Sequence, residues 1–365
     1  VSDIEGRYLA KDVELKGGDK ILRGTLITTN LHTRLKNSGP QKVLVRSPLH
    51  CQVSNGICAT CYGLSERGKP YEVGTNIGII AGHALGEPVT QMQMRTFHTG
   101  GAGSSAVDDY YARAKDLFKV PKKLRGQATL STVSGTVQKI TPDALGGKVV
   151  RIDNKDHIVP HTNELLPSVR VGTQIRKAEA LSTGRKNPHE ILKITNSISA
   201  VRNHITSELG KLYMDSTGIG RRRNVEVVVR AMTDVTSVGN NSEDEGLLRG
   251  QLTSLSALEN RNKELKMLGL PEVKHTPVLK SLDKVPLSGQ EDWMARLNFQ
   301  RLKDTFVEGT AQNWKSDING HPIPGLAHGA EFGVDKTPTL TTSALKVNLP
   351  EIKKNPSFSF FGKGQ

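Results

Sequence analysis

The sequence has few aromatic residues and no long hydrophobic run. Aromatic side chains make up 4% of the 365 residues, beside 36 Gly and 17 Pro. This composition is typical of several small modules joined by irregular connections, and it argues against one large core. No apolar run approaches the roughly 18 residues that a membrane helix needs, and the first residues lack the apolar segment of a signal peptide. We therefore expect an intracellular protein with no membrane partner.

Acidic residues are also in deficit. The chain has 50 Lys and Arg against 36 Asp and Glu, which gives a formal net charge of +14. A strongly basic chain favours a polyanionic partner, and nucleic acid is the first candidate. A basic protein that is merely soluble is the alternative.

Cysteine is scarce, but all three cysteines fall in the string CQVSNGICATC, with the spacing C-x6-C-x2-C. Such a cluster suits a metal or redox role better than a disulfide framework. Thiolates two residues apart on a turn converge on one ion, so Cys58 and Cys61, with Cys51 as a third ligand, predict a structural zinc site. A redox pair is the alternative. His50 is awkwardly placed to complete the tetrahedron, and we expect the fourth ligand to come from another chain.

Composition and hydrophobic period divide the chain into consecutive segments, and together they predict a multi-module α+β fold with no independent compact single core. The segments are a β-rich stretch at 1–50, a cysteine knuckle at 51–75, a helical hairpin at 76–120, a β-rich module at 121–187, a helix plus strand at 188–238, a helical region at 239–321, and a C-terminal segment with a basic tail at 322–365.

Individual elements are predicted within these segments. Alternation predicts a strand at KVLVR and further strands in GQATLSTVSGTVQKI and GGKVVRIDN. Apolar residues between Ile198 and Leu212 recur at helical spacing, and Gly218 and Gly220 close that helix. The run VEVVVRAM is compatible with a buried strand or a short helix, and another helix is expected from Trp293 to Gln312.

A chemically unusual helix face lies in GIIAGHALGEPVTQMQMRTFHTGGAG, residues 78–103. The pattern from 76 to 98 is helical, with an interruption expected at Gly86 to Pro88. Gln91, Met94, Arg95 and His98 stand at i, i+3, i+4 and i+7, which places them on one face. They offer an amide, a thioether, a guanidinium and an imidazole, a set that suits the sugar, base and phosphates of a nucleoside triphosphate. An ordinary amphipathic helix with Met and Phe in the core is the alternative.

Small residues follow this helix and separate it from a second helix, predicted from Asp108 to Val120. Gly100, Gly101 and Gly103 lie in this connection, TGGAGSSA. A helix, a glycine hinge and a second helix form a hairpin that could open and close. Simple helix termination is the alternative role of these glycines.

The order RSPLHC, NGICATCYG, GIIAGHALGEPVTQMQMRTFHTGG closely resembles the C-terminal half of the β′ subunit of bacterial-type multisubunit RNA polymerase, where a cysteine knuckle leads into the trigger loop. The likeness is most specific at residues 46–101. It extends through ARAKDLFKV, LYMDSTGIGRRRNVEVVVRAM, NFQRLKDTFVEGT and PIPGLAHGAEFG, the last two of which resemble the switch region. The chain departs from the family's AAQSIGEPGT at His83 and Val89.

The resemblance implies a DNA-directed RNA polymerase subunit whose trigger loop closes on the incoming nucleotide. Gln91 would contact the ribose, Met94 would pack on the base, and Arg95 and His98 would reach the phosphates. Arginine suits phosphate because its planar fork donates charge-assisted hydrogen bonds. His98 could act as a general acid or only as a positive dipole, and the sequence leaves both roles open.

The family's magnesium motif, NADFDGD, does not occur in the 365 residues. The acidic string SEDEG at 242–246 is most simply a solvated loop. By resemblance we expect a split β′ subunit, as in giant bacteriophage RNA polymerases, that works in the cytoplasm of an infected host or in a virion. Its partners would be an N-terminal β′ fragment that holds Mg²⁺, β-like chains, DNA template, RNA product and nucleoside triphosphate, all in a hetero-oligomer. The alternative is a non-catalytic zinc-knuckle protein that binds nucleic acid or assists assembly.

Four arginines are weaker candidates for contacts with nucleic acid. Arg221, Arg222 and Arg223 follow a helix stop, and a solvated turn is an equal alternative for them. Arg46 precedes the knuckle and is expected to pair with a phosphate or a carboxylate.

Overall fold

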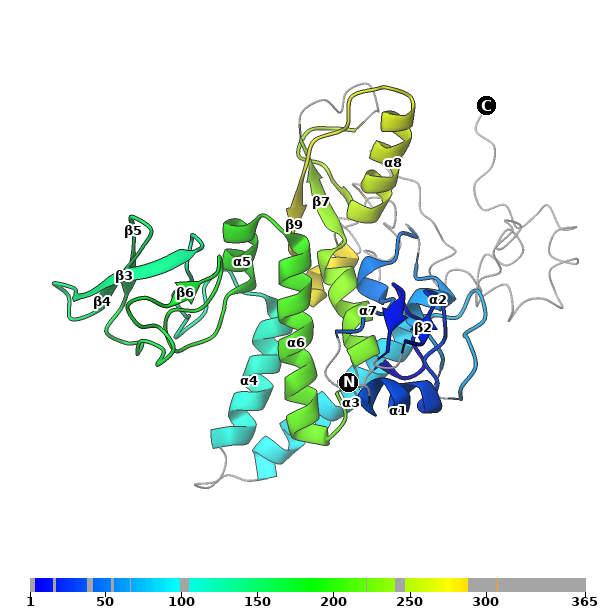
Figure 1. The fold of residues 1–365 in the computed structure, drawn as a ribbon, viewed down its shortest axis with the longest axis horizontal. Helices are drawn as coiled ribbons and strands as arrows, with labels where there is room; N and C mark the ends of the chain where they lie inside the picture. The colour runs from blue at the N-terminus through cyan, green and yellow to red at the C-terminus, as the bar shows by residue number, and fades with distance from the viewer. Residues whose placement is uncertain are drawn as a thin grey trace, which may run out of the picture. The chain divides into compact units, whose positions relative to one another are not determined.

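The computed structural model describes the backbone of residues 4–15, 18–37, 42–53, 56–65, 67–98, 105–220, 222–239, 247–287 and 307, and the side chains of these residues except 91–98 and 105–109. Within this part the fold is mixed α+β, with eight α-helices and three small sheets (Figure 1). The described residues divide into two compact units, one of residues up to 85, 222–278 and 282 onward, and one of 86–221 and 279–281. Separate hydrophobic clusters replace a single core, which confirms the predicted fold class.

The N-terminal part of the first unit combines short strands with a helix. Strands β1 (Val13–Glu14) and β2 (Lys20–Ile21) pair antiparallel, and α1 (Thr29–Asn37) follows. Leu9, Ile27 and Leu35 are buried in the local core. Helix α1 was not predicted from the sequence. The strand predicted at KVLVR is wrong, because only Val45 forms a bridge there, to Leu9.

The knuckle segment and the later part of the first unit contain short elements around one helix. They are η2 (Pro48–His50), α2 (Ala59–Tyr62), α7 (Arg222–Thr233), β7 (Val235–Val238), β8 (Leu252–Ser254), α8 (Leu255–Met267), β9 (His275–Val278) and η4 (Leu282–Leu287). The sheet has the order β8-β7-β9, and α7 packs against η2 and η4. The run VEVVVRAM is therefore a helix. This conformation places Arg222, Glu226 and Arg230, spaced by four residues, on one face.

The first helix of the predicted hairpin, α3 (Ile77–His98), is continuous through Pro88. The interruption expected at Gly86 to Pro88 is thus wrong. Proline removes one backbone donor and crowds the preceding turn, which usually kinks or breaks a helix. Here the Thr90 hydroxyl donates to the Gly86 carbonyl at 3.0 Å, a side-chain bond within the same turn. The second helix, α4 (Ser105–Lys119), begins slightly before its predicted start.

The β-rich module of the second unit is confirmed by a four-stranded antiparallel sheet with the order β5-β4-β3-β6. Its strands are β3 (Gly135–Pro142), β4 (Lys148–Ile152), β5 (Lys155–Val159) and β6 (Gln174–Ile175). Alternating residues such as Val150, Ile152 and Val159 fill its core, whereas Lys148 and Arg151 are exposed. The module therefore has its own hydrophobic core.

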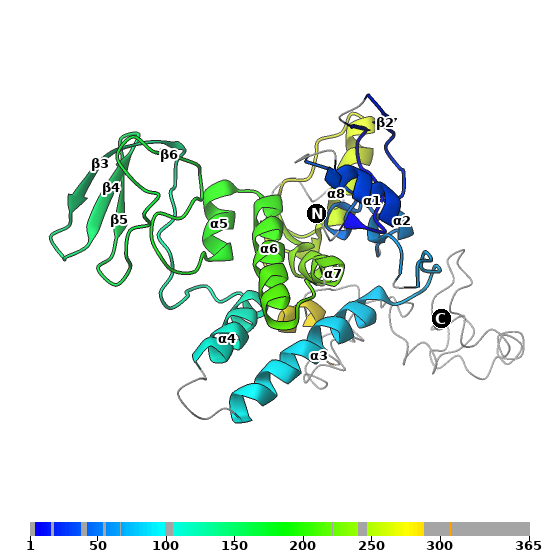
Figure 2. The ribbon, with the colours of Figure 1, turned by 60° about the horizontal axis from the view of Figure 1, so that its bottom comes forward.

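Helices α5 (Pro188–Thr195) and α6 (Ile198–Thr217) pack together in the second unit, and α4 packs against α6 (Figure 2). Asn187 caps α5 by accepting a hydrogen bond from the His189 amide at 2.9 Å. The apolar stripe predicted between Ile198 and Leu212 is confirmed as the packed face of α6, and Gly218 ends it with φ 73°.

Other predictions fall outside the described residues. They are the acidic loop at 242–246, the helix from Trp293 to Gln312, and the segment at 322–365. Within 293–312 only residue 307 is described, and it is helical. No described helix is long and apolar enough to cross a membrane.

Candidate metal centre and helix face

The cysteine cluster is brought together by two short turns of the first unit. Cys51 follows η2, Cys58 caps the N-terminus of α2, and Cys61 lies in its last turn. The three Sγ atoms lie within 4.8 Å of one another, and no other described residue joins this group. Cys51 and Cys61 are buried, Cys58 is half-buried, and all three are free of disulfides. The structure thus brings together all three predicted ligands.

The surroundings of the cluster shift the pKa values of Cys51 and Cys61 in opposite directions. Burial disfavours the thiolate of Cys51, but the backbone amides of Cys58 and Val53 and the nearby Arg230 outweigh it, and they lower the pKa of Cys51 to about 7. Burial raises the pKa of Cys61 to about 12. The Cys58 amide donates to the Cys51 sulfur at 3.3 Å. Of Cys51 and Cys61, Cys51 is therefore the thiol that its surroundings favour for ionisation.

The donor set fits zinc. Four-coordinate zinc takes Cys sulfur at about 2.3 Å, which corresponds to sulfur atoms separated by roughly 3.8 Å in a tetrahedron. Three sulfurs already within 4.8 Å need only small side-chain movements to reach that arrangement. Three clustered cysteines can therefore hold a zinc ion, with one tetrahedral position left for a ligand from outside the described residues.

Two arginines lie beside the cysteines. Arg46 places Nη2 3.6 Å from the Cys61 sulfur. Arg230, from α7, donates from Nη1 to the Pro48 carbonyl at 3.0 Å and from Nη2 to the Val53 carbonyl at 2.6 Å. The Arg46 side chain thus has a sulfur rather than a carboxylate as its partner among the described residues.

The arginines at the start of α7 bind within the first unit. Arg222 Nε donates to Glu226 at 3.1 Å, although the Arg222 side chain is 48% exposed. Arg223 donates to the carbonyls of Leu64, at 2.5 Å, and Glu5. Arg221 lies outside the described residues. Of these residues, Arg222 keeps the most surface for a further contact with phosphate.

The predicted helix face is on α3, with Gln91, Met94, Arg95 and His98 in its last two turns. The continuous helix preserves the spacing that places them on one face, while their side chains lie outside the described part. Gly100, Gly101 and Gly103 also lie outside it. His83 is exposed on the same helix, one turn before Pro88.

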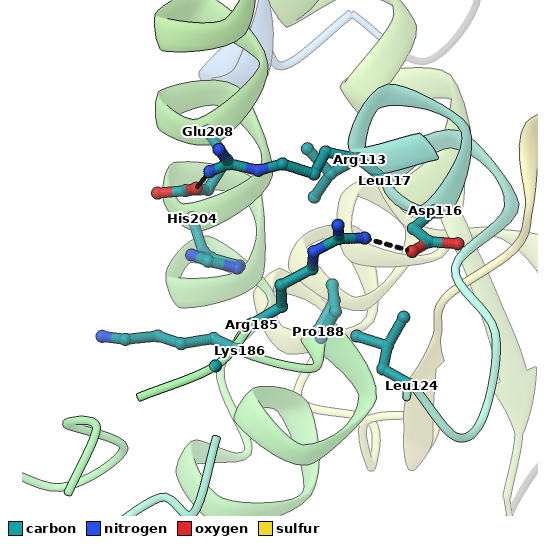
Figure 3. A pocket seen from close by; sticks show the side chains of 10 residues that line it. Arg113, Asp116, Leu117, Leu124, Arg185, Lys186, Pro188, His204 and Glu208 are labelled. Carbon is teal, nitrogen blue, oxygen red and sulfur yellow. Dashed lines mark hydrogen bonds and ion pairs between the residues drawn. The ribbon is translucent and has the colours of Figure 1, made fainter. Parts of the chain in front are cut away.

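A cavity of about 180 Å³ lies in the second unit between α4, α6 and the segment that enters α5 (Figure 3). Arg113 pairs with Glu208 at 3.6 Å, and Arg185 pairs with Asp116 at 2.8 Å. These pairs connect α4 to α6 and to the end of the β-rich module. Burial is the main cause that lowers the pKa of His204, another lining residue.

Arg230 and Glu226, which hold the segment that leads into the knuckle, were not predicted from the sequence. Both charges interrupt an apolar run, VEVVVRAM, and both are almost fully buried. A charged side chain inside such a run requires a buried partner, which is the signal that could have identified them.

Comparisons with known proteins agree with the sequence resemblance. Residues 15–148 match the family model described as RNA polymerase Rpb1, domain 5. The chain is similar to the DNA-directed RNA polymerase subunit beta′ of Thermobifida fusca, with 34% identity over 98% of this chain and 28% of the relative. It is also similar to the same subunit from Streptococcus thermophilus, with 30% identity over 86% of this chain and 26% of the relative, and from Caldicellulosiruptor saccharolyticus, with 32% identity over 84% and 27%.

The chain spans between 26% and 28% of the length of these curated relatives. It is therefore homologous to a portion of the bacterial RNA polymerase β′ subunit.

Proposed function

We propose, from the homology to bacterial β′, that this chain supplies the trigger loop of a multisubunit DNA-dependent RNA polymerase. The observation that carries the proposal is α3: one continuous helix carries Gln91, Met94, Arg95 and His98 at spacings that share a face. A second helix, α4, follows it within the segment that matches the polymerase family. Alone, the chain is inert.

The helix face acts on the nucleoside triphosphate by orientation and charge. Gln91 contacts the ribose and Met94 packs on the base, so the substrate is aligned along the helix. Arg95 and His98 face the phosphates, where a guanidinium and an imidazole stabilise charge that develops during phosphoryl transfer. Gly100, Gly101 and Gly103 allow the hairpin to close over the substrate and reopen.

The metal ions have separate roles in this proposal. Zinc holds the knuckle together through Cys51, Cys58 and Cys61, and its fourth ligand comes from another chain. Mg²⁺, when bound, stabilises charge at the reacting phosphates. In this proposal, the aspartates that bind Mg²⁺ belong to a partner subunit. The chain therefore contributes substrate positioning and leaves Mg²⁺ binding to its partner.

Partners follow from the same proposal. The chain assembles with an N-terminal β′ fragment and β-like chains, and the complex contacts DNA template and RNA product. The net charge of +14 supports a polyanionic partner. Arg46, Arg221, Arg222 and Arg223 are candidate nucleic-acid contacts, of which Arg46 and Arg222 are exposed in the described part.

Single-nucleotide addition by the assembled enzyme tests the function. Arg95→Ala and His98→Ala are each expected to slow addition by a factor of about ten or more. Gln93→Ala is the matched control, because Gln93 lies on the same helix but on another face, and it should leave the rate within about twofold. Rates unaffected by Arg95→Ala and His98→Ala would favour the alternative, a non-catalytic zinc-knuckle protein that binds nucleic acid or assists assembly.

The finer proposal is a split β′ subunit of bacteriophage origin, at work in the infected host or in the virion. Intact-mass analysis of the native complex tests it. The expected result is that the chain containing this sequence is separate from the chain that carries three closely spaced aspartates. One continuous β′ chain would contradict the split.

A further inference from the structure

We infer that Arg46 and Arg230 are positioning residues of the metal centre, which hold the cysteine turns in place and compensate the charge of their sulfurs. This inference rests on the proposal that the cysteine cluster binds zinc. Neither residue is a metal ligand; each acts through the groups that it contacts.

Arg230 fixes the chain on both sides of Cys51. Its two Nη atoms donate to the Pro48 carbonyl at 3.0 Å and to the Val53 carbonyl at 2.6 Å. These carbonyls precede and follow Cys51, so one planar fork spans the turn that carries the first ligand. The residue is only 6% exposed, and its bonds cross from α7 to a segment 177 or more positions away in sequence. Movement of Cys51 away from the cluster would break one or both bonds.

Arg46 contacts Cys61, the last of the three cysteines in the sequence. Its Nη2 lies 3.6 Å from the Cys61 sulfur. Its own backbone amide donates to the Tyr8 carbonyl at 2.8 Å, which anchors the base of the side chain. The guanidinium therefore lies against the sulfur of a buried member of the ligand set.

Charge explains why arginine occupies both positions. A divalent ion with three thiolates carries a formal charge of roughly −1, and a fourth anionic ligand would increase it. Partly buried negative charge is costly unless cations or hydrogen bonds compensate it. Two permanently charged guanidiniums supply that compensation. Lysine could supply the charge but not the fork that reaches two carbonyls.

Arg223 offers a matched comparison on the same helix. It also joins α7 to distant carbonyls, those of Leu64 and Glu5, but these two carbonyls do not lie on both sides of one cysteine. Loss of Arg223 weakens the attachment of α7, whereas loss of Arg230 weakens that attachment and also releases the Cys51 turn. The two variants therefore separate anchoring from metal positioning.

The test measures zinc release from the full chain in its assembled complex. Zinc content is determined for the wild type, and the rate of transfer to a chromogenic chelator is then compared among variants. Outer residues that orient metal ligands change metal affinity by about 10- to 100-fold when replaced, so Arg230→Met is expected to accelerate release on that scale. Arg46→Met should have a smaller effect in the same direction. Arg230→Lys should restore the rate only in part, and Arg223→Met should stay within about twofold of the wild type.

Cobalt substitution provides a readout that general destabilisation does not reproduce. The thiolate-to-cobalt absorption of Arg230→Lys is expected to shift while the complex remains assembled in gel filtration. If Arg230→Met does not assemble, Arg230→Lys and Arg46→Lys carry the test.

Two results would overturn the inference. One is a rate of zinc release in the Arg230 and Arg46 variants that equals the wild-type rate. The other is a rate in Arg223→Met that rises as much as the rate in Arg230→Met. A wild-type complex without zinc would remove the metal proposal and this inference together. The polymerase function is judged separately, by the nucleotide-addition rate of the same complex.

Discussion

Arg7 and Glu226 form a buried ion pair that joins the N-terminal segment of the first unit to α7. Arg7 Nη1 lies 2.7 Å from Glu226 Oε2, with the side chains 2% and 3% exposed. Glu226 also accepts hydrogen bonds from the Ser47 hydroxyl at 2.8 Å and from Arg222 at 3.1 Å. One carboxylate on α7 thus ties together an N-terminal segment and the residue that caps η2, the turn before Cys51.

Glu226→Ala should be one of the most destabilising single changes in this unit. It leaves the Arg7 guanidinium buried without its main counter-charge, a change that typically costs about 3–5 kcal/mol. Urea unfolding of the purified chain, followed by circular dichroism, measures the loss. Asp19→Ala is the control, since its pair with Arg34 is 68% and 52% exposed and should contribute less than about 1 kcal/mol. Equal losses in the two variants would contradict this ranking.

Gly63 should tolerate a methyl group far less well than Gly68. Both have positive φ, 90° and 72°, so alanine at either position is strained in its backbone, at a cost of roughly 1–3 kcal/mol. At Gly63, however, a Cβ would collide with the backbone carbonyl of Gly6, whereas at Gly68 it would meet nothing within 4 Å. The larger drop in unfolding midpoint is therefore expected for Gly63→Ala. A larger drop for Gly68→Ala would show that the two chain segments separate easily.

Local patterns predicted those parts of the fold that local physics determines. The α6 stripe, from Val201 to Leu212, follows from helical spacing, and the β3 and β4 strands follow from alternation between turns. The cysteine cluster was predictable because two ligands lie in one turn and the third is close in sequence. In each case the interacting residues lie within one element or a short loop.

Two features of the helices could not be predicted from local patterns. Pro88 predicts a break, but the helix continues through it. The β-branched run at 227–229 is compatible with a strand. It forms α7 instead, because helical spacing brings Arg222, Glu226 and Arg230 to one face. On that face, Glu226 and Arg230 contact partners more than 170 positions away in sequence. Propensity contains no information about such partners.

Pro88→Ala should strengthen the middle of α3. Proline in a helix interior costs about 3 kcal/mol relative to alanine because it lacks an N–H and crowds the preceding turn. The variant is expected to show slower amide hydrogen exchange in peptides that span residues 84–90. Thr90→Val removes the hydroxyl bond to the Gly86 carbonyl and should accelerate exchange there. Unchanged exchange in both variants would mean that neither residue governs the local opening of the helix.

His204 should make the second unit less stable in mild acid. Burial is the largest cause that lowers its pKa, and the charges of Lys186 and Lys211 lower it further, although Glu208 opposes them. Because the folded pKa is below the unfolded value of about 6.5, the unfolded chain binds more protons in the window between the two values. The free energy of unfolding therefore rises with pH through this window. It falls as the pH drops from the unfolded pKa of His204 towards its folded pKa.

The comparison of two variants isolates this effect. The urea midpoint of the wild type, measured at about pH 5.5 and about pH 7.5 on either side of the ordinary histidine value, is expected to fall on acidification. His204→Gln cannot gain that proton, so its midpoint should fall less. His161→Gln is the control, because His161 is exposed in the same unit, and it should keep the wild-type dependence. If His204→Gln and the wild type lost equal stability in acid, the pH dependence would have to come from other groups, and the lowered pKa of His204 would be wrong.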